Sequence, residues 1–339
     1  MPPTINDVAR EAGVGIGTVS RVLNGNPLVK AATRQKVLAA VERLGYRPSP
    51  AARAFGRRRT HILELLVPLF AGGFFLEILR GVEAALANTP YTLLVRTIES
   101  ADDRTRVFGD CCRRTSSDGV LVVWVPPTEQ FIQRVADEGF VPVLMNAVDR
   151  RLPSVAVNHD VAAEQAVSYC LANGHRRIAL VDRLEDPFDP ASGGICERGY
   201  AETLAAAGLS TSPEYRRLAD FSAPGGAAAL DALLAVPEPP TAIVAGSEVQ
   251  ALGIVEAARV RGWRVPADLS IVGYNDSELA QFLGLTTVQV PVREMARQAT
   301  QVLLNALAQP DSEPKVSYLP TELVVRQTCG PPRTAELKR

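Results

Sequence analysis

The chain has 339 residues, of which 47% are hydrophobic, and a formal net charge of −1. This length is too great for one ordinary hydrophobic core and fits two or three domains. No apolar run reaches the roughly 18 residues that a membrane helix needs, and the polar N-terminal segment does not have the form of a secretory signal. The composition excludes a membrane protein and predicts a soluble, cytoplasmic globular protein.

Positive charge is concentrated at the N-terminal end of the chain. Residues 1–60 hold eleven Lys and Arg against three acidic residues, whereas the remainder holds 25 basic and 34 acidic residues. Neutralisation of phosphate by Lys and Arg releases counterions, and this release drives binding to nucleic acid. A basic module on an acidic body therefore indicates that only the N-terminal part meets phosphate.

Cysteine and histidine are sparse and are not arranged as metal ligands. Five cysteines, an odd number without framework spacing, favour a reducing compartment. The adjacent Cys111 and Cys112 are interpreted as small core residues, with a redox or metal pair as the less favoured alternative. The sequence has no P-loop, and Gly72-Gly73 and Gly193-Gly194 alone are too weak to indicate a nucleotide site. We therefore expect no metal, no cofactor and no enzymatic activity.

Two short helices are the first predicted elements. Thr4 caps the first helix, Asp7 reaches back as in a capping box, and Gly13 ends the helix. The apolar stripe of this helix consists of Ile5, Val8, Ala9 and Ala12. The second helix turns Val19, Val22 and Leu23 inward, which leaves an outward face of Ile16, Gly17, Ser20, Arg21 and Asn24. Two such helices with a Gly-containing turn are typical of a helix-turn-helix, whose second helix enters the DNA major groove.

A third helix is predicted over residues 29–46, with inward side chains at Val37, Leu38, Val41 and Leu44. The positions that cap the second and third helices hold Gly15 and Lys30. Glycine costs little at an N-cap, but lysine has no acceptor for the helix N–H groups. Gly17 in the first turn of the second helix adds about 1 kcal/mol of helix cost. These choices predict a three-helix unit of reduced stability by itself.

Beyond His61 the pattern changes to short apolar strands that alternate with helices. Strands are predicted over residues 62–68, 91–97, 119–125, 141–146, 178–182, 241–245 and 269–274. Helices are predicted over residues 75–88, 102–115, 128–139, 160–173, 197–207, 225–234 and 248–261. This alternation implies parallel sheets with right-handed crossovers, arranged as two α/β lobes with a cleft between them. Such a cleft can act as a ligand-controlled switch, because a bound ligand favours the closed over the open arrangement of the lobes.

Several motifs occur in a fixed order along the chain. The first 48 residues contain Asp7-Val8-Ala9, Ala12-Gly13-Val14, Thr18-Val19-Ser20-Arg21-Val22-Leu23-Asn24, Thr33-Arg34, Lys36-Val37 and Leu44-Gly45-Tyr46-Arg47-Pro48. The body contains Asn173-Gly174-His175-Arg176-Arg177-Ile178-Ala179, Ala251-Leu252-Gly253, Val265-Pro266-Ala267-Asp268-Leu269-Ser270-Ile271-Val272-Gly273-Tyr274 and Leu285-Thr286-Thr287-Val288. In these motifs the chain resembles the lactose/galactose-repressor (LacI/GalR) family of bacterial transcription regulators.

The resemblance implies an all-α helix-turn-helix headpiece followed by an α/β, two-lobed, periplasmic-binding-protein-like core with parallel sheets. The headpiece would span residues 1–47, the hinge helix or linker 48–60, the effector-binding and dimerisation core 61–330 and the tail 331–339. Lobe 1 would contain about 61–158 and 290–319, and lobe 2 about 159–289 and 320–330. The chain would thus cross between the lobes near residues 158, 289 and 320, and a helix over residues 295–308 would return to lobe 1.

The same resemblance implies a sequence-specific DNA-binding regulator, expected to be a repressor that binds a near-palindromic operator as a homodimer. Arg21 would bond guanine or phosphate, and Ile16 would touch a thymine methyl. In Ala52-Arg53-Ala54-Phe55 the aromatic ring replaces the usual Leu wedge of the hinge in the minor groove. The expected DNA contacts are Thr4, Ile16, Gly17, Thr18, Ser20, Arg21, Asn24, Arg34, Tyr46, Arg53 and Phe55.

The cleft departs from the pattern of relatives that bind sugars or purines. Cys196 stands where an Arg is usual, Ser247-Glu248 replaces Asn-Asp, and Asn275 replaces an Asp. The expected effector contacts are Phe74, Phe75, Asn146, Cys196, Arg198, Ser247 and Asn275. Three interpretations stay open: a less hydroxylated small-molecule effector, a cleft that has lost ligand control, or loops that let Arg198 replace the missing Arg.

Two other classes of protein share parts of this organisation. A solute-binding protein has the same two-lobed core, but it predicts an export signal and no headpiece, and the sequence has the reverse. An enzyme would need a nucleophile with a base, a metal cluster or a phosphate loop in the cleft. The tail lacks a long leucine heptad, so we do not expect a tetramer-forming coiled coil.

Overall fold

The computed structural model describes residues 3–23, 26, 28–46, 59–68, 72–111, 117–184, 188, 194, 196–309 and 313–333. The predicted DNA contacts Asn24, Arg53 and Phe55 lie outside the described residues. Most of the predicted hinge, Cys112 and the end of the tail also lie outside them. No helix in the described part of the chain is long and apolar enough to cross a membrane.

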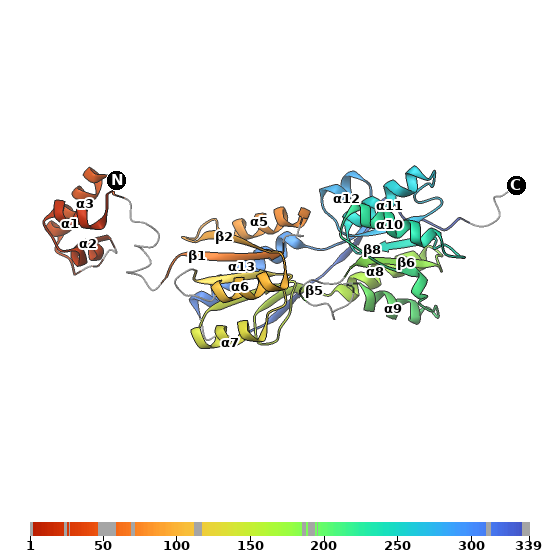
Figure 1. The fold of residues 1–339 in the computed structure, drawn as a ribbon, viewed down its shortest axis with the longest axis horizontal. Coiled ribbons are helices and arrows are strands. Elements are labelled where there is room, and N and C mark those ends of the chain that lie inside the picture. Colours follow the sequence, from red (N-terminus) through yellow and green to blue (C-terminus); the bar gives the residue numbers. More distant parts are fainter. Residues whose placement is uncertain are drawn as a thin grey trace.

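Three helices form the N-terminal unit, labelled α1 (Ile5–Ala12), α2 (Ile16–Leu23) and α3 (Ala31–Leu44) in Figure 1. Val8, Val19 and Val37 are fully buried, one from each helix, and together they form the centre of its small core. The prediction that Leu38 points inward was wrong, because its side chain is 48% exposed and Ala40 is buried instead. Leu38 follows Val37 by about 100° around the helix, which turns it toward solvent.

The ends of these helices follow from local chemistry. The backbone N–H and the hydroxyl of Thr4 both donate to the Asp7 carboxylate, at 2.9 and 2.7 Å. Gly13 ends α1 and Gly45 ends α3, both with a left-handed backbone that glycine adopts without steric cost. Lys30 is the N-cap of α3 and makes no side-chain capping bond, because an ammonium group has no hydrogen-bond acceptor.

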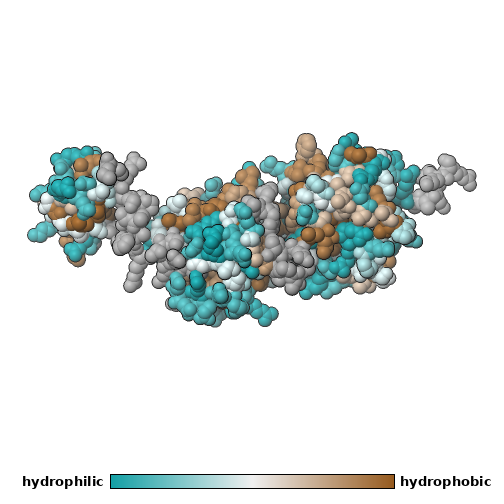
Figure 2. Space-filling view, viewed as in Figure 1, coloured by the Kyte–Doolittle hydropathy of each residue, from teal (hydrophilic) through white to brown (hydrophobic). Residues whose placement is uncertain are grey.

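Lobe 1 is a parallel six-stranded sheet in the order β11-β5-β4-β3-β1-β2. Its strands are β1 (Ile62–Pro68), β2 (Thr92–Ile98), β3 (Gly119–Val123), β4 (Val141–Met145), β5 (Ser154–Val157) and β11 (Val316–Leu319). Its helices are α5 (Gly72–Leu86), α6 (Ala101–Cys111), α7 (Glu129–Glu138) and α13 (Val292–Ala308). In Figure 2 hydrophilic residues cover α6 and α7, whereas apolar residues gather along the edge that carries β2 and α5.

Lobe 2 repeats the plan in the order β12-β10-β9-β8-β6-β7, with β12 antiparallel to β10. Its strands are β6 (Ile178–Arg183), β7 (Arg216–Ala219), β8 (Ala242–Ala245), β9 (Ser270–Asn275), β10 (Thr286–Gln289) and β12 (Glu322–Val324). Its helices are α8 (His159–Ala172), α9 (Glu197–Ala206), α10 (Ala223–Leu234), α11 (Glu248–Val260) and α12 (Glu278–Phe282), with a 3₁₀ turn at Pro213–Tyr215. The predicted alternation of strands and helices, and the parallel sheets, are confirmed.

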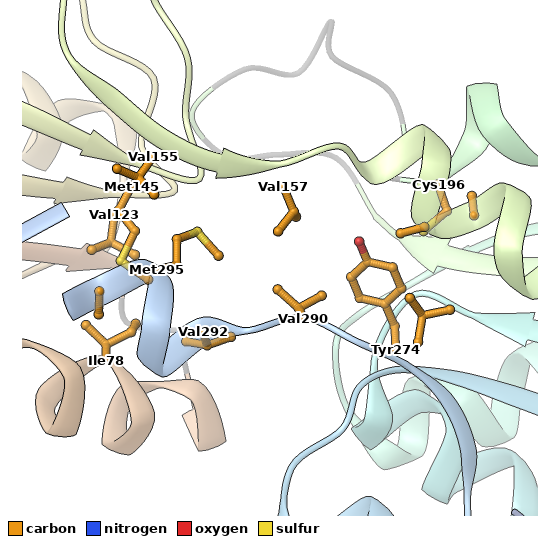
Figure 3. Close-up of a cluster of buried hydrophobic side chains, with 14 of the residues drawn as sticks. Ile78, Val123, Met145, Val155, Val157, Cys196, Tyr274, Val290, Val292 and Met295 are labelled. Carbon is orange, nitrogen blue, oxygen red and sulfur yellow. The ribbon is translucent and has the colours of Figure 1, made fainter. Parts of the chain in front are cut away.

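The chain passes between the two sheets after β5, after β10 and between β11 and β12. One buried apolar cluster follows these passages from lobe 1 into lobe 2. Figure 3 shows Val157 and Val290 on two of the connecting segments, with the ring of Tyr274 beside Val290 on the lobe 2 side. The lobes are therefore joined by packed side chains as well as by covalent connections.

Candidate DNA-binding surface and interlobe cleft

The outer face of α2 carries the residue types that suit a groove. Val19 and Val22 are buried against α1 and α3, which turns Ile16, Gly17 and Arg21 to solvent. The Ile16 side chain is 50% exposed, so it is accessible for contact with a partner. Gly17 has no side chain and lets the helix backbone come close to a groove. Ile16 offers an apolar contact, and the Arg21 guanidinium offers two donors for a bidentate hydrogen bond.

The other described residues of the predicted DNA surface differ in position. Thr4 is exposed at the start of α1, while Thr18 and Ser20 are half-buried on α2. The Arg34 guanidinium donates to the backbone oxygen of Asn26 at 2.6 Å and so holds the connection between α2 and α3. Tyr46 is 7% exposed and packs in the small core of the headpiece, so its ring supports the unit from inside.

A cavity of about 40 Å³ lies between the lobes, where strands of both sheets end. Its lining residues are Phe74, Trp124, Asn146, His159, Arg183, Phe221, Gly246, Tyr274, Asn275 and Val290. Carboxyl ends of parallel strands are where ligands bind in open α/β sheets. The cavity therefore lies where the topology predicts a binding site.

Backbone conformation directs three of these side chains. Trp124 follows β3, Asn146 follows β4 and Asn275 ends β9, and all three have positive φ angles of 55°, 56° and 108°. A residue other than glycine rarely adopts this left-handed region, and a bulky residue such as tryptophan pays about 1–3 kcal/mol for it. Such conformations cluster at ligand clamps, which supports a binding role for this cavity.

The cavity wall combines aromatic rings with neutral polar groups. Phe74 and Trp124 meet edge to face, with ring centroids 5.3 Å apart. The Nδ1 atom of His159 lies 2.6 Å from the Tyr274 hydroxyl. Burial, helped by the positive charge of Arg183, lowers the pKa of His159 to about 4, and burial raises the pKa of Tyr274 well above its ordinary value. Both groups are therefore neutral at pH 7.

Only some of the predicted effector contacts lie at the cavity. Phe74, Asn146 and Asn275 line the cavity. Phe75 is partly buried and packs against the main apolar cluster, one position further along α5. For the remaining three predicted contacts, Cys196, Arg198 and Ser247, the structure gives a different place.

These three residues have structural partners away from the cavity. Cys196 is fully buried, and its backbone N–H donates to the Asp182 carboxylate at 2.8 Å. Arg198 is 72% exposed on α9 and pairs with Asp160, so it does not replace the missing cleft arginine. The Ser247 hydroxyl caps α11 by accepting the N–H of Gln250 at 3.2 Å. The sequence interpretation missed seven lining residues, which are Trp124, His159, Arg183, Phe221, Gly246, Tyr274 and Val290.

A helix-turn-helix headpiece joined to two α/β lobes around a cleft defines a DNA-binding regulator with a ligand-binding core. Residues 4–49 match the lacI family of bacterial regulatory proteins, and residues 167–329 match the periplasmic binding protein-like domain. The chain is 32% identical to catabolite control protein A of Priestia megaterium, over 97% of this chain and 99% of that protein. The chain belongs to the lacI family and is a DNA-binding transcriptional regulator.

Other relatives span the full chain in the same way. The HTH-type transcriptional repressor CytR of Escherichia coli strain K12 is 32% identical over 95% of each chain. The solved complex of the transcriptional regulator CelR with cellobiose is 31% identical, with a TM-score of 0.71, over 96% of this chain and 99% of that chain. The solved structure of the lac repressor dimer bound to operator and the anti-inducer ONPF is 26% identical, with a TM-score of 0.79, over 97% of this chain and 99% of that chain.

Proposed function

We propose that this regulator is a cytoplasmic repressor that binds a near-palindromic operator as a homodimer and is controlled by a small molecule in the cleft. The headpiece would be residues 1–47, the hinge 48–60 and the two-lobed core 61–330. The observation that carries the DNA role is the outward face of α2, where Ile16, Gly17 and Arg21 are exposed together. Two such helices related by a two-fold axis read two half-sites, which one headpiece lacks the surface to do.

The dimer contact is proposed to use the edge that carries α5 and α12, here named the α5–α12 face. Leu76 on α5 is 51% exposed and Phe282 on α12 is 88% exposed. A groove between α5, α12 and α13 continues this face from lobe 1 to lobe 2. Both helices lie along the same edge of the core in Figure 1, and apolar residues are visible there in Figure 2. Large exposed apolar residues at one edge, with charged side chains such as Glu77, Arg80 and Arg293 around the groove between them, support this edge as the interface.

Control by a small molecule is supported by the place of the cleft. A ligand that binds both lobes favours one lobe arrangement over another by its difference in affinity for the two. The three connecting segments and the shared apolar cluster link the two lobes mechanically. A change in the lobe arrangement would therefore reach lobe 1, whose first strand, β1, follows the hinge. The complexes of relatives with cellobiose and ONPF place small molecules on proteins of this fold.

The test is selection of DNA sequences from a random pool by the full-length protein, followed by a release screen of small molecules on the selected duplex. A palindromic consensus is the expected result, and failure to select any sequence would overturn the proposal. Sedimentation of Phe282→Asp should show a weakened dimer. Val260→Asp is a matched control, because Val260 is an exposed apolar residue (68%) at the end of α11.

A second candidate is a regulator whose cleft no longer answers to a sugar. The cavity volume of about 40 Å³ favours this alternative, since it leaves room for water but not for a sugar ring in the present arrangement. A selected operator that no sugar releases would support this candidate. Release by a common hexose or disaccharide would exclude it.

A further inference from the structure

The chain enters lobe 1 through a short segment that one carboxylate holds in place. The backbone N–H and the hydroxyl of Thr60 donate to the Asp118 carboxylate at 2.6 and 2.7 Å, and the N–H of His61 donates to it at 3.0 Å. The backbone N–H of Asp118 donates in turn to the oxygen of Ile62 at 2.8 Å. A single side chain therefore fixes both residues that precede β1.

The backbone of His61 is bent at this point. Its φ angle is 55°, in the left-handed region that residues other than glycine rarely adopt. The oxygen of His61 accepts the N–H of Thr92 at 2.9 Å, and its ring lies beside that of Tyr91, with centroids 5.6 Å apart. Such a conformation persists only where the surroundings hold it, and it is often found where a segment has a functional role. The bend is therefore maintained by lobe 1 itself.

Arg59 ties the preceding residue to a different element. Its guanidinium donates to the backbone oxygen of Leu307 at 2.6 Å, in the last turn of α13. The last carbonyl groups of a helix have no partner within the helix and carry partial negative charge, so a cation there is favourable. Arg59, Thr60 and His61, with Asp118 and the Leu307 carbonyl, are here named the linker clamp.

The linker clamp lies at the amino ends of the lobe 1 strands. His61 directly precedes β1 and Asp118 directly precedes β3, and these strands are parallel neighbours. The cleft cavity lies instead at the carboxyl ends of strands, so the clamp and the cavity are at opposite edges of this sheet. Only residues 47–58 separate the clamp from the described part of the headpiece. The clamp is thus the last fixed point of the core before the DNA-binding unit.

A fixed exit from the core has a consequence for a dimer that binds two half-sites. The second headpiece binds as a tethered group, and its effective concentration depends on whether the tether reaches the second half-site. One extra base pair moves a half-site by about 3.4 Å and turns it by about 35° around the DNA axis. A tether whose origin and direction are fixed should discriminate against this change, whereas a loose one should tolerate it.

We propose that Asp118 is a positioning residue for DNA binding: through Thr60 and His61 it fixes the direction in which the chain leaves lobe 1, and so sets the half-site spacing that the dimer accepts. This inference rests on the proposed binding of a near-palindromic operator by a homodimer. The outward face of α2 selects the bases of each half-site, and the linker clamp determines how far apart the two half-sites lie.

Two variants loosen the clamp in different ways. Asp118→Asn has nearly the same shape, but its one acceptor oxygen cannot take all three hydrogen bonds. His61→Gly keeps the N–H that bonds Asp118, but glycine leaves the left-handed conformation as readily as it adopts it. Asp137→Asn is the matched control, because it removes the same charge from lobe 1 at an exposed carboxylate of α7 that bonds Gln133 at 3.0 Å.

The clamp itself is tested without DNA, by hydrogen exchange of the Thr60 and His61 amides in the full-length protein. Both amides should exchange slowly in the parent, and at least about tenfold faster in Asp118→Asn, because local opening becomes that much more frequent. Asp137→Asn should exchange as the parent does. Rapid exchange of both amides in the parent, or equal rates in the parent and Asp118→Asn, would overturn the proposal.

The positioning role is tested on the selected operator and on duplexes with the same half-sites and one base pair added or removed between them. The parent and Asp137→Asn should bind the altered spacings about tenfold more weakly, and this preference should fall to about twofold in Asp118→Asn and His61→Gly. Thermal melting and sedimentation establish that each variant is a folded dimer. A spacing preference that persists in both folded variants would overturn the positioning role alone. Failure to select any operator would overturn the proposed repressor function and the positioning role with it.

Discussion

The Nδ1 atom of His159 and the hydroxyl of Tyr274 lie 2.6 Å apart, and this contact joins the first turn of α8 to the end of β9. His159 directly follows the passage from lobe 1 into lobe 2, so the pair stands where the lobes meet. Their rings are tilted by 32° with centroids 5.9 Å apart. Protonation of His159 would therefore place a positive charge inside this buried junction.

Stability should fall as the pH drops below 6.5 because of His159. Burial lowers its pKa to about 4 in the folded chain, from an ordinary value of 6.5. Below pH 6.5 the unfolded chain binds a proton at this site and the folded chain does not, so lower pH favours unfolding. The expected loss is about 1–2 kcal/mol between pH 6.5 and pH 5. Urea denaturation across this range measures it.

The control is His159→Asn, which retains an acceptor for the Tyr274 hydroxyl and removes the titrating group. Its free energy of unfolding should change less steeply with pH over the same window, since the imidazole whose pKa is lowered by folding has been removed. Equal slopes in the parent and the variant would show that His159 does not titrate as its surroundings imply.

Gly81→Ala should destabilise lobe 1. A Cβ at Gly81 would overlap the backbone oxygen of Arg293 and lie 2.8 Å from the Cβ of Ala296, so α5 and α13 pack directly over this glycine. Forcing the helices apart costs about 1–3 kcal/mol in a packed core. Thermal unfolding should show a lower midpoint, and an unchanged midpoint would mean that the two helices adjust without cost.

Gly17→Ala, in contrast, should stabilise helix α2. No atom lies within 4 Å of a Cβ at Gly17, and its backbone is helical. Alanine is favoured over glycine in a helix by about 1 kcal/mol. Hydrogen exchange of the α2 amides in the full-length protein should slow by about fivefold, since local opening becomes that much rarer. Equal or faster exchange would contradict the prediction that this glycine weakens the headpiece.

Much of the architecture could be predicted from the sequence because its signals are local. Apolar runs marked most of the buried strands, and Gly13 marked the end of α1 in its left-handed conformation. The strands β5, β7, β10, β11 and β12 have three or four residues each and were not predicted. Strands this short carry little periodicity, and β7 and β11 are half-exposed edge strands whose pairing depends on distant partners.

The cleft was predicted less well because its residues come from many separate strand ends. Phe74, Asn146 and Asn275 were expected in the cleft and line the cavity, whereas Cys196 and Ser247 are held by bonds within lobe 2. Matching single positions to a family pattern overlooked the carboxyl-end rule, which points to Trp124, Arg183 and Gly246. A Gly or Arg after a strand is also common in ordinary loops, so only the assembled topology distinguishes these residues.

Arg21→Ala should abolish operator binding at physiological salt. Arg21 is exposed on α2, on the same outward face as Ile16 and Gly17, which have no hydrogen-bonding side chain. Few other side chains on this face offer several donors, so one guanidinium carries a large share of the polar contact. A mobility-shift assay on the selected operator measures the loss, and undiminished affinity would refute the assignment.

Salt dependence separates the two ways in which Arg21 can act. If it reads guanine, Arg21→Ala should weaken the selected operator much more than unrelated DNA. If it anchors phosphate, both affinities should fall together and the salt slope should decrease by about one counterion. Arg10→Ala is the matched control, because Arg10 is 80% exposed on α1 and pairs with Asp7 at 3.4 Å. A similar loss in both variants would mean that headpiece charge, rather than the α2 face, determines binding.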